Sequence, residues 1–91
     1  MAAGRPADAP VHRPGRVVNR NGAPVPDALV SIVESTVPMP EVALVGDADG
    51  RFALSLPPGR FTLRAHAAAG TGQVDVEGTP TEHEIVIVIG D

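Results

Sequence analysis

Ten prolines and ten glycines divide this chain of 91 residues into short runs. Proline removes a backbone N–H and clashes inside a helix, so prolines at this spacing exclude long helices. An amphipathic helix would need apolar residues at a period of 3.6 over about ten residues without proline, and no such stretch is present. The chain is therefore predicted to consist of short extended elements joined by turns.

Strand-forming runs lie between the turn signals, at residues 16–19, 28–34, 41–45, 51–56, 60–67, 73–77 and 82–89. Two of these runs alternate strictly in polarity, with Phe52 and Leu54 on one face of the first and Phe61 and Leu63 on one face of the second. A period of two with one polar face is typical of a half-buried antiparallel strand. Seven such runs in about 80 residues predict an all-β fold, a two-layer β-sandwich.

The alternations also define an expected core between the two layers. Its expected members are Val30, Ile32, Phe52, Leu54, Phe61, Leu63, Val74 and Val76. Phe52 and Phe61 are the only aromatic residues of the chain, so we expect them to anchor this core. Asn21-Gly22 and Asp49-Gly50 stand at hairpin positions, where glycine readily adopts a positive φ.

The same alternation leaves some apolar residues on the outer faces of the two sheets. The last run is apolar on both faces, so either its isoleucines or its valines face outward, and a strand of this kind is usually covered on both sides. A loop or the chain's own leader is one candidate cover, and another subunit or strand addition at a free edge is the other. The expected protein-docking surface consists of Leu29, Val33, Val86 and Val88.

The organisation along the chain is simple. Residues 1–10 are predicted to form a flexible leader and residues 11–91 one domain. No stretch approaches the ~18 apolar residues of a membrane helix, and the N-terminal residues contain no apolar signal-peptide core. The chain as written is therefore expected to be cytoplasmic, and to be secreted or exported only where a signal has been removed.

Charge and composition exclude several function classes. Residues 1–16 carry three arginines and one aspartate, whereas residues 17–91 carry four arginines and ten acidic residues. An acidic body repels phosphate backbones, so nucleic-acid binding is not expected. The absence of tyrosine and tryptophan argues against stacking of sugars or single-stranded bases, and the absence of cysteine excludes disulfides and thiolate chemistry.

Candidate catalytic and metal-binding residues do not form recognisable motifs. His12, His66 and His83 lack the spacing of a zinc site, because none is followed three residues later by glutamate. Asp47 and Asp49 resemble part of a calcium loop, but a hairpin turn explains the same residues and the further ligands are missing. No cofactor, metal or catalytic residue is therefore expected, and a weak calcium site at these aspartates stays open as an alternative.

Four segments in order resemble the carboxypeptidase regulatory-like domain. They are GRV at residues 15–17, NGAPVPDALV at 21–30, DADGRFAL at 47–54 and LPPGRFTL at 56–63. The resemblance covers roughly residues 14–90 and implies a transthyretin-like (prealbumin-like) fold, a seven-stranded antiparallel Greek-key β-sandwich. One departure is Phe61, which stands where the family commonly has tyrosine.

The resemblance implies a non-catalytic module that binds protein, as an adaptor or a small subunit of a larger assembly. Settings known for such domains include multidomain secreted proteins and phage-tail-like or secretion machines. The alternatives are a small hydrolase or metal-dependent enzyme, or a carbohydrate- or surface-binding module. A related sandwich occurs in hydroxyisourate hydrolase, but that family ends in a Tyr-Arg-Gly-Ser tail, whereas this chain ends in Ile89-Gly90-Asp91.

Overall fold

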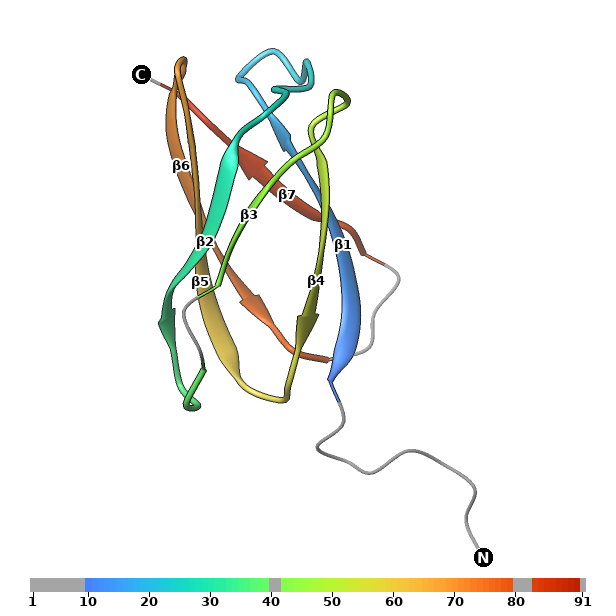
Figure 1. Cartoon of the computed structure of the whole chain (residues 1–91), viewed down its shortest axis with the longest axis vertical. Helices are drawn as coiled ribbons and strands as arrows, with labels where there is room; N and C mark the ends of the chain where they lie inside the picture. Colours follow the sequence, from blue (N-terminus) through green and yellow to red (C-terminus); the bar gives the residue numbers. More distant parts are fainter. Residues whose placement is uncertain (1–9, 40–41, 80–82, 91) are drawn as a thin grey trace, which may run out of the picture.

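The computed structural model describes residues 10–39, 42–79 and 83–90. In these ranges the chain forms seven strands and no helix, which confirms the all-β prediction. The strands are β1 (Val11–Val18), β2 (Leu29–Ser35), β3 (Ala43–Val45), β4 (Arg51–Leu56), β5 (Arg60–Ala67), β6 (Gly70–Glu77) and β7 (Ile85–Val88). They form two layers (Figure 1), one sheet in the order β4-β1-β7 and the other in the order β3-β2-β5-β6. The expected leader at residues 1–10 lies, apart from Pro10, outside the described residues.

The chain crosses between the sheets four times, at the β1–β2, β3–β4, β4–β5 and β6–β7 connections. Among the described strands all pairs are antiparallel except one, because β1 and β7 run parallel. Their register joins Gly15 to Ile85 and Val18 to Val88. Side-chain alternation has the same period in parallel and antiparallel strands, so the polarity pattern does not predict this direction.

The core lies between the two sheets, and it contains the residues that alternation predicts. Phe52, Leu54, Phe61, Leu63 and Val30 are buried, and Ile32, Val74 and Val76 are partly buried and pack against them. The structure also resolves the ambiguous last run. Its isoleucines at 85, 87 and 89 face the core, and its valines at 86 and 88 face outward.

Side-chain carbonyl and carboxylate oxygens hold two of the turns. The Oδ1 atom of Asn19 accepts hydrogen bonds from the backbone N–H groups of Asn21 and Ala23, at 2.9 and 3.0 Å. The Oδ1 atom of Asp47 accepts from the N–H groups of Asp49 and Arg51, both at 2.9 Å. Such bonds pull the chain into a compact turn, and each turn contains a glycine with positive φ, at residues 22 and 50.

β1 begins at Val11, earlier than the predicted run at residues 16–19, although it contains Pro14. The N–H of Val17 donates to the Gly50 carbonyl on the β4 side (2.7 Å), and the Val18 carbonyl accepts from Ile89 on the β7 side (2.9 Å). The backbone of Pro14 therefore faces the β7 side, by the alternation of the ladder. Since β7 begins at Ile85, opposite Gly15, the missing N–H of Pro14 costs no ladder bond.

β6 is an edge strand, and among the described residues its only backbone hydrogen bond to the β7 segment lies near Thr71. The N–H of Gly90 donates to the Thr71 carbonyl at 3.1 Å, just beyond the end of β7. A Cβ atom on Gly72 would lie 2.8 Å from the carbonyl carbon of Val88, so glycine is needed for this close approach. Further along β6, toward Glu77, a groove lies between β6 and β7.

Candidate functional site

The four predicted docking residues lie on two different sheets. Leu29 and Val33 belong to β2, and their side chains are 43% and 38% exposed. Val86 and Val88 belong to β7 in the other sheet and are 36% and 51% exposed. All four therefore face outward, but the structure does not bring them together into one surface. Leu29 and Val33 lie on one outer face of the sandwich, and Val86 and Val88 on the opposite sheet.

A further exposed apolar residue, which is not among the four predicted docking residues, lies beside Leu29. Val45 on β3 is the register partner of Leu29 and is 62% exposed. Val33 lies at a β-bulge, where the pairing of β2 with β5 shifts between Ile32 and Glu34. We call Leu29, Val33 and Val45 the β2–β3 face. The apolar run at 41–45 was a signal for Val45, but a strand of three residues is too short to assign a parity from alternation.

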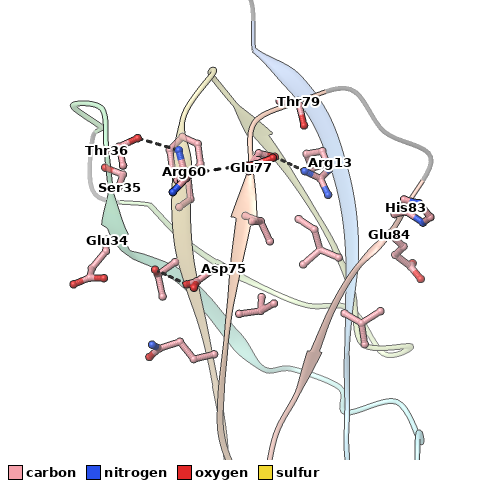
Figure 2. Close-up of a pocket in the computed structure, with 17 residues that line it drawn as sticks. Arg13, Glu34, Ser35, Thr36, Arg60, Asp75, Glu77, Thr79, His83 and Glu84 are labelled. Carbon is pink, nitrogen blue, oxygen red and sulfur yellow. Dashed lines mark hydrogen bonds and ion pairs between the residues drawn. The ribbon is translucent and has the colours of Figure 1, made fainter.

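A second candidate site is the groove between β6 and β7, with a volume of about 1140 Å³ (Figure 2). β6 from Gln73 to Glu77 lines one side and the segment from His83 to Val86 another, and the lining continues onto the adjacent ends of β2 and β5, around Glu34 and Arg60. Val74 and Val76 on β6 and Ile85 on β7 give the groove apolar lining. The groove therefore lies between the two sheets, at a place where no backbone ladder joins β6 to β7 in the described residues.

Arg13 on β1 reaches into this groove from the core side. It lies at an inward position of β1, between the buried residues Val11 and Gly15, and is only 7% exposed. One guanidinium nitrogen, Nη1, donates a hydrogen bond to the backbone carbonyl of Glu77 on β6. The Nε atom is buried and has no hydrogen-bond partner. In the sequence, Arg13 contributes to the basic charge of residues 1–16, and its alternation with Val11, Gly15 and Val17 is the signal that places it inside.

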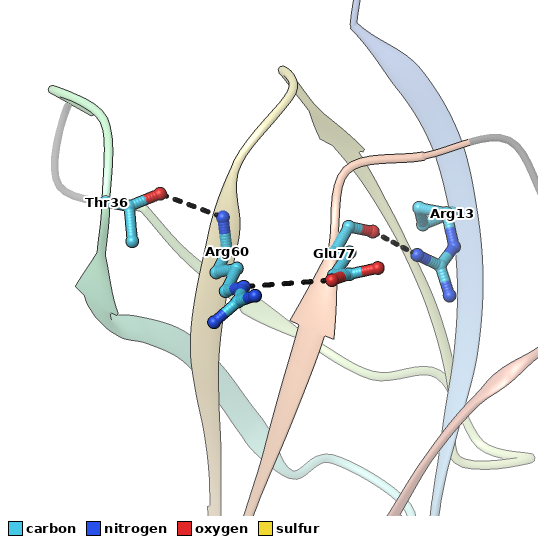
Figure 3. A network of polar contacts seen from close by, with 4 residues as sticks. All are labelled: Arg13, Thr36, Arg60 and Glu77. Carbon is cyan, nitrogen blue, oxygen red and sulfur yellow. Dashed lines mark hydrogen bonds and ion pairs between the residues drawn. The ribbon is translucent and has the colours of Figure 1, made fainter.

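Polar contacts link Arg13 through Glu77 and Arg60 to Thr36, so that they connect β1, β6, β5 and the end of β2 (Figure 3). The carboxylate of Glu77 lies 3.8 Å from Nε of Arg60 on β5, and both of these side chains are exposed. The backbone N–H of Arg60 donates to Oγ1 of Thr36, which follows β2, at 2.9 Å. Exposed ion pairs of this kind contribute little stability. The Glu77 carbonyl is placed beside Arg13 by the pairing of β5 with β6, in which Glu77 is opposite Arg60.

The candidate catalytic and metal-binding residues stay apart. His12, His66 and His83 are all exposed, on β1, on β5 and before β7. Within residues 10–39, 42–79 and 83–90, no group of three or more histidine, cysteine or acidic side chains could hold a metal ion. The Asp47 carboxylate is occupied by two backbone N–H groups, as a hairpin turn requires. The described part of the chain also contains no helix suited to crossing a bilayer.

Comparison with known proteins agrees with the fold and with the ordered motifs. No curated protein matches the chain. The family model for the carboxypeptidase regulatory-like domain matches residues 14–88, which includes every strand from most of β1 to the end of β7. This family is a regulatory β-sandwich type that is generally non-catalytic. The match spans most of the sequence, and the chain therefore belongs to the carboxypeptidase regulatory-like domain family.

Proposed function

We propose that this chain is a non-catalytic, protein-binding module that acts as an adaptor or a small structural subunit of a larger assembly. The observation that carries this proposal is the exposed pair of Leu29 and Val45, two large apolar side chains directly opposite each other on neighbouring strands. Val33 is a further exposed apolar residue on β2, with Ser31 between it and Leu29. Contiguous apolar side chains on a small domain mark an interaction surface more often than scattered ones do.

The size of the domain supports association. A chain of 91 residues without cysteine buries a small core and gains no stability from disulfides. A partner that binds only the folded state would add stability by mass action, which matters most for a domain with a small core. The family type and the separation of the histidines give no support to the alternative of a hydrolase or metal-dependent enzyme.

Val86 and Val88 form the second outward-facing apolar pair. They lie along one edge strand, next to the ion pair between Arg16 and Glu84 (3.0 Å), so charge borders this pair directly. The β2–β3 face joins apolar side chains across two strands, which gives a broader apolar contact. We therefore propose the β2–β3 face as the main docking surface, and Val86 and Val88 serve as its comparison.

The experiment is capture of the tagged chain from its native source, followed by quantitative mass spectrometry. The double variant Leu29→Ser with Val45→Ser is expected to lose stoichiometric partners, while Val86→Ser with Val88→Ser keeps them. All variants are first checked for a native thermal transition. Loss of partners only in the β7 variant assigns docking to the other sheet, and recovery of the wild-type chain without any partner contradicts the proposal.

A further inference from the structure

The groove between β6 and β7 contains a buried cation, Arg13, whose guanidinium has one buried nitrogen without a hydrogen-bond partner. A guanidinium has five N–H donors, and Arg13 uses one of them on the Glu77 carbonyl. Its Nε atom is buried without a partner. A buried charge that lacks acceptors is strongly unfavourable, and a planar guanidinium pairs best with a carboxylate, which accepts two parallel N–H bonds. A bound carboxylate would therefore complete the environment of Arg13.

Three of the four acidic side chains that line the groove are engaged elsewhere, and the fourth, Glu34, is exposed on β2. Glu77 pairs with Arg60, and Glu84 pairs with Arg16. The carboxylate of Asp75 accepts a hydrogen bond from the hydroxyl of Thr62 at 2.8 Å. Neither ion pair found in the described residues includes Arg13. The domain thus provides the cation, and the matching anion is left for a ligand to supply.

β6 provides the second half of the site, a row of unpaired backbone groups. The carbonyls of Thr71 and Glu77 both face the β7 side, because they accept from Gly90 and Arg13. By the alternation of the ladder, Gln73 and Asp75 between them also direct their N–H and C=O groups into the groove. In the described part of the chain, β5 is the only strand that pairs with this segment of β6. An unpaired edge of this kind is a template for an extended chain.

We propose that the groove binds an extended peptide segment of a protein partner, added as a strand to β6, with an inward-facing glutamate or aspartate of that segment bonded to Arg13. This inference rests on the proposed function, since it names a partner class for a protein-binding module. In an added strand, alternate side chains face the core. One of them meets Arg13, and its inward neighbours pack against Val74 and Val76. The free backbone groups along β6 favour a chain segment as the occupant, because an extended peptide can pair with them along the edge.

The first test is selection of a phage-displayed library of random heptapeptides on the whole chain. The enriched sequences are expected to share one acidic position, flanked two residues away by apolar residues. Synthetic copies of them are expected to shift the NMR signals of the Gln73 and Asp75 amides and of the Arg13 Nε–H group. Enrichment without a shared acid, shifts confined to the β2–β3 face, or no enrichment at all would each overturn the inference.

Two variants of Arg13 test the role of its charge. Arg13→Met keeps most of the apolar stem and removes the charge, and it is expected to weaken peptide binding about tenfold to a hundredfold. Arg13→Lys keeps the charge but cannot donate two parallel hydrogen bonds to a carboxylate. Its affinity for the peptide is therefore expected to lie between those of the wild-type chain and Arg13→Met. The Arg13→Met domain is expected to unfold at the wild-type temperature or above it, because an unpaired buried charge has been removed. Wild-type affinity in Arg13→Met contradicts the inference, and a lowered midpoint assigns Arg13 a structural role instead.

Two variants of Gln73 test strand addition with a matched control. Gln73→Pro and Gln73→Ala both remove the side chain and its contact with Arg64. Only the proline also removes the N–H that faces the groove, and this N–H belongs to the free edge and not to the β5 ladder. Gln73→Pro is expected to weaken binding at least tenfold, and Gln73→Ala less than about twofold. Equal affinities of the two variants, with both folded by circular dichroism, would contradict strand addition.

The inference and the proposed function fail in different ways. If partners captured from the native source depend on Leu29 and Val45 and no acidic peptide binds the groove, the proposed function stands and this inference is wrong. If acidic peptides bind and lose affinity in Arg13→Met while the native chain is recovered alone, the groove is a peptide site and the assembly role is wrong.

Discussion

The ring of Phe52 on β4 lies over Gly15 on β1, in the space where another residue would carry its side chain. The two residues are register partners in the antiparallel pair of β1 and β4. A Cβ atom on Gly15 would lie 2.7 Å from Cε1 of Phe52, which is closer than real atoms approach. The glycine therefore allows one of the two aromatic rings of the chain to cover bare backbone and fill the core.

We expect Gly15→Ala to lower the free energy of unfolding by about 1–3 kcal/mol, because the new methyl group displaces the Phe52 ring from a packed core. Urea denaturation followed by circular dichroism measures the change. Gly46→Ala is the control, since a Cβ atom there would lie 3.4 Å from its nearest neighbour, the Arg51 carbonyl oxygen. Combining Gly15→Ala with Phe52→Leu is expected to cost less than the sum of the two single changes. Simple additivity would show that the ring and the methyl group do not compete.

We expect Gly72→Ala to separate β6 from the end of β7. A Cβ atom on Gly72 would lie 2.8 Å from the carbonyl carbon of Val88 and 3.1 Å from Cα of Ile89, so the backbones must move apart. The hydrogen bond from Gly90 N–H to Thr71 then opens, and hydrogen exchange of the Gly90 amide is expected to accelerate at least tenfold. Exchange of Gly90 at the wild-type rate would show that the two edges tolerate the methyl group.

Neighbouring residues of β7 are expected to differ sharply in their effect on stability. Ile87 is fully buried, and replacing it with alanine is expected to cost about 2–5 kcal/mol. Val88 is half exposed on the other face, and Val88→Ala is expected to change stability by about 0.5 kcal/mol or less. Thermal and urea denaturation of the two single variants measure the difference. A cost above about 1.5 kcal/mol for Val88→Ala would mean that other residues cover this face in solution.

We expect Asp47→Ala to cost about 1–2 kcal/mol, since two backbone N–H groups in the β3–β4 turn lose their shared acceptor. Asp47→Asn keeps an acceptor oxygen at the same position and is expected to recover most of that stability. Addition of Ca²⁺ is expected to leave the thermal midpoint of the wild-type domain unchanged, because the Asp47 carboxylate is already occupied by the turn. A midpoint that rises with Ca²⁺ concentration would instead support a metal site at Asp47 and Asp49.

Much of the fold follows from the local sequence. The strict alternation around Phe52 and Phe61 places both rings in the core, because each strand has one polar face. Glycines 22 and 50 are predicted at positive φ for the same local reason, the geometry of tight turns. Alternation in a strand that is apolar on both faces carries no such information. Only the packing of the second sheet decides that Ile87, rather than Val88, faces inward.

The site depends on pairings between distant segments, which local patterns do not contain. Arg13 becomes a buried groove residue because β1 starts at Val11 and because β7 begins only opposite Gly15. Val45 joins the β2–β3 face through its register with Leu29, which a three-residue strand cannot reveal by itself. The separation of Val86 and Val88 from Leu29 and Val33 follows from the assignment of β2 and β7 to different sheets.

The parallel pairing of β1 with β7 determines how the domain responds to tension. The chain enters β1 at one end of the sandwich and leaves β7 at the opposite end (Figure 1). A pull on both ends therefore acts along the two strands and tries to slide Gly15–Val18 past Ile85–Val88. The evenly spaced bonds between these segments share such a load together, whereas bonds at the open end of a hairpin break one after another. A domain loaded in this shearing direction therefore resists extension better than one whose terminal strands are peeled apart from one end.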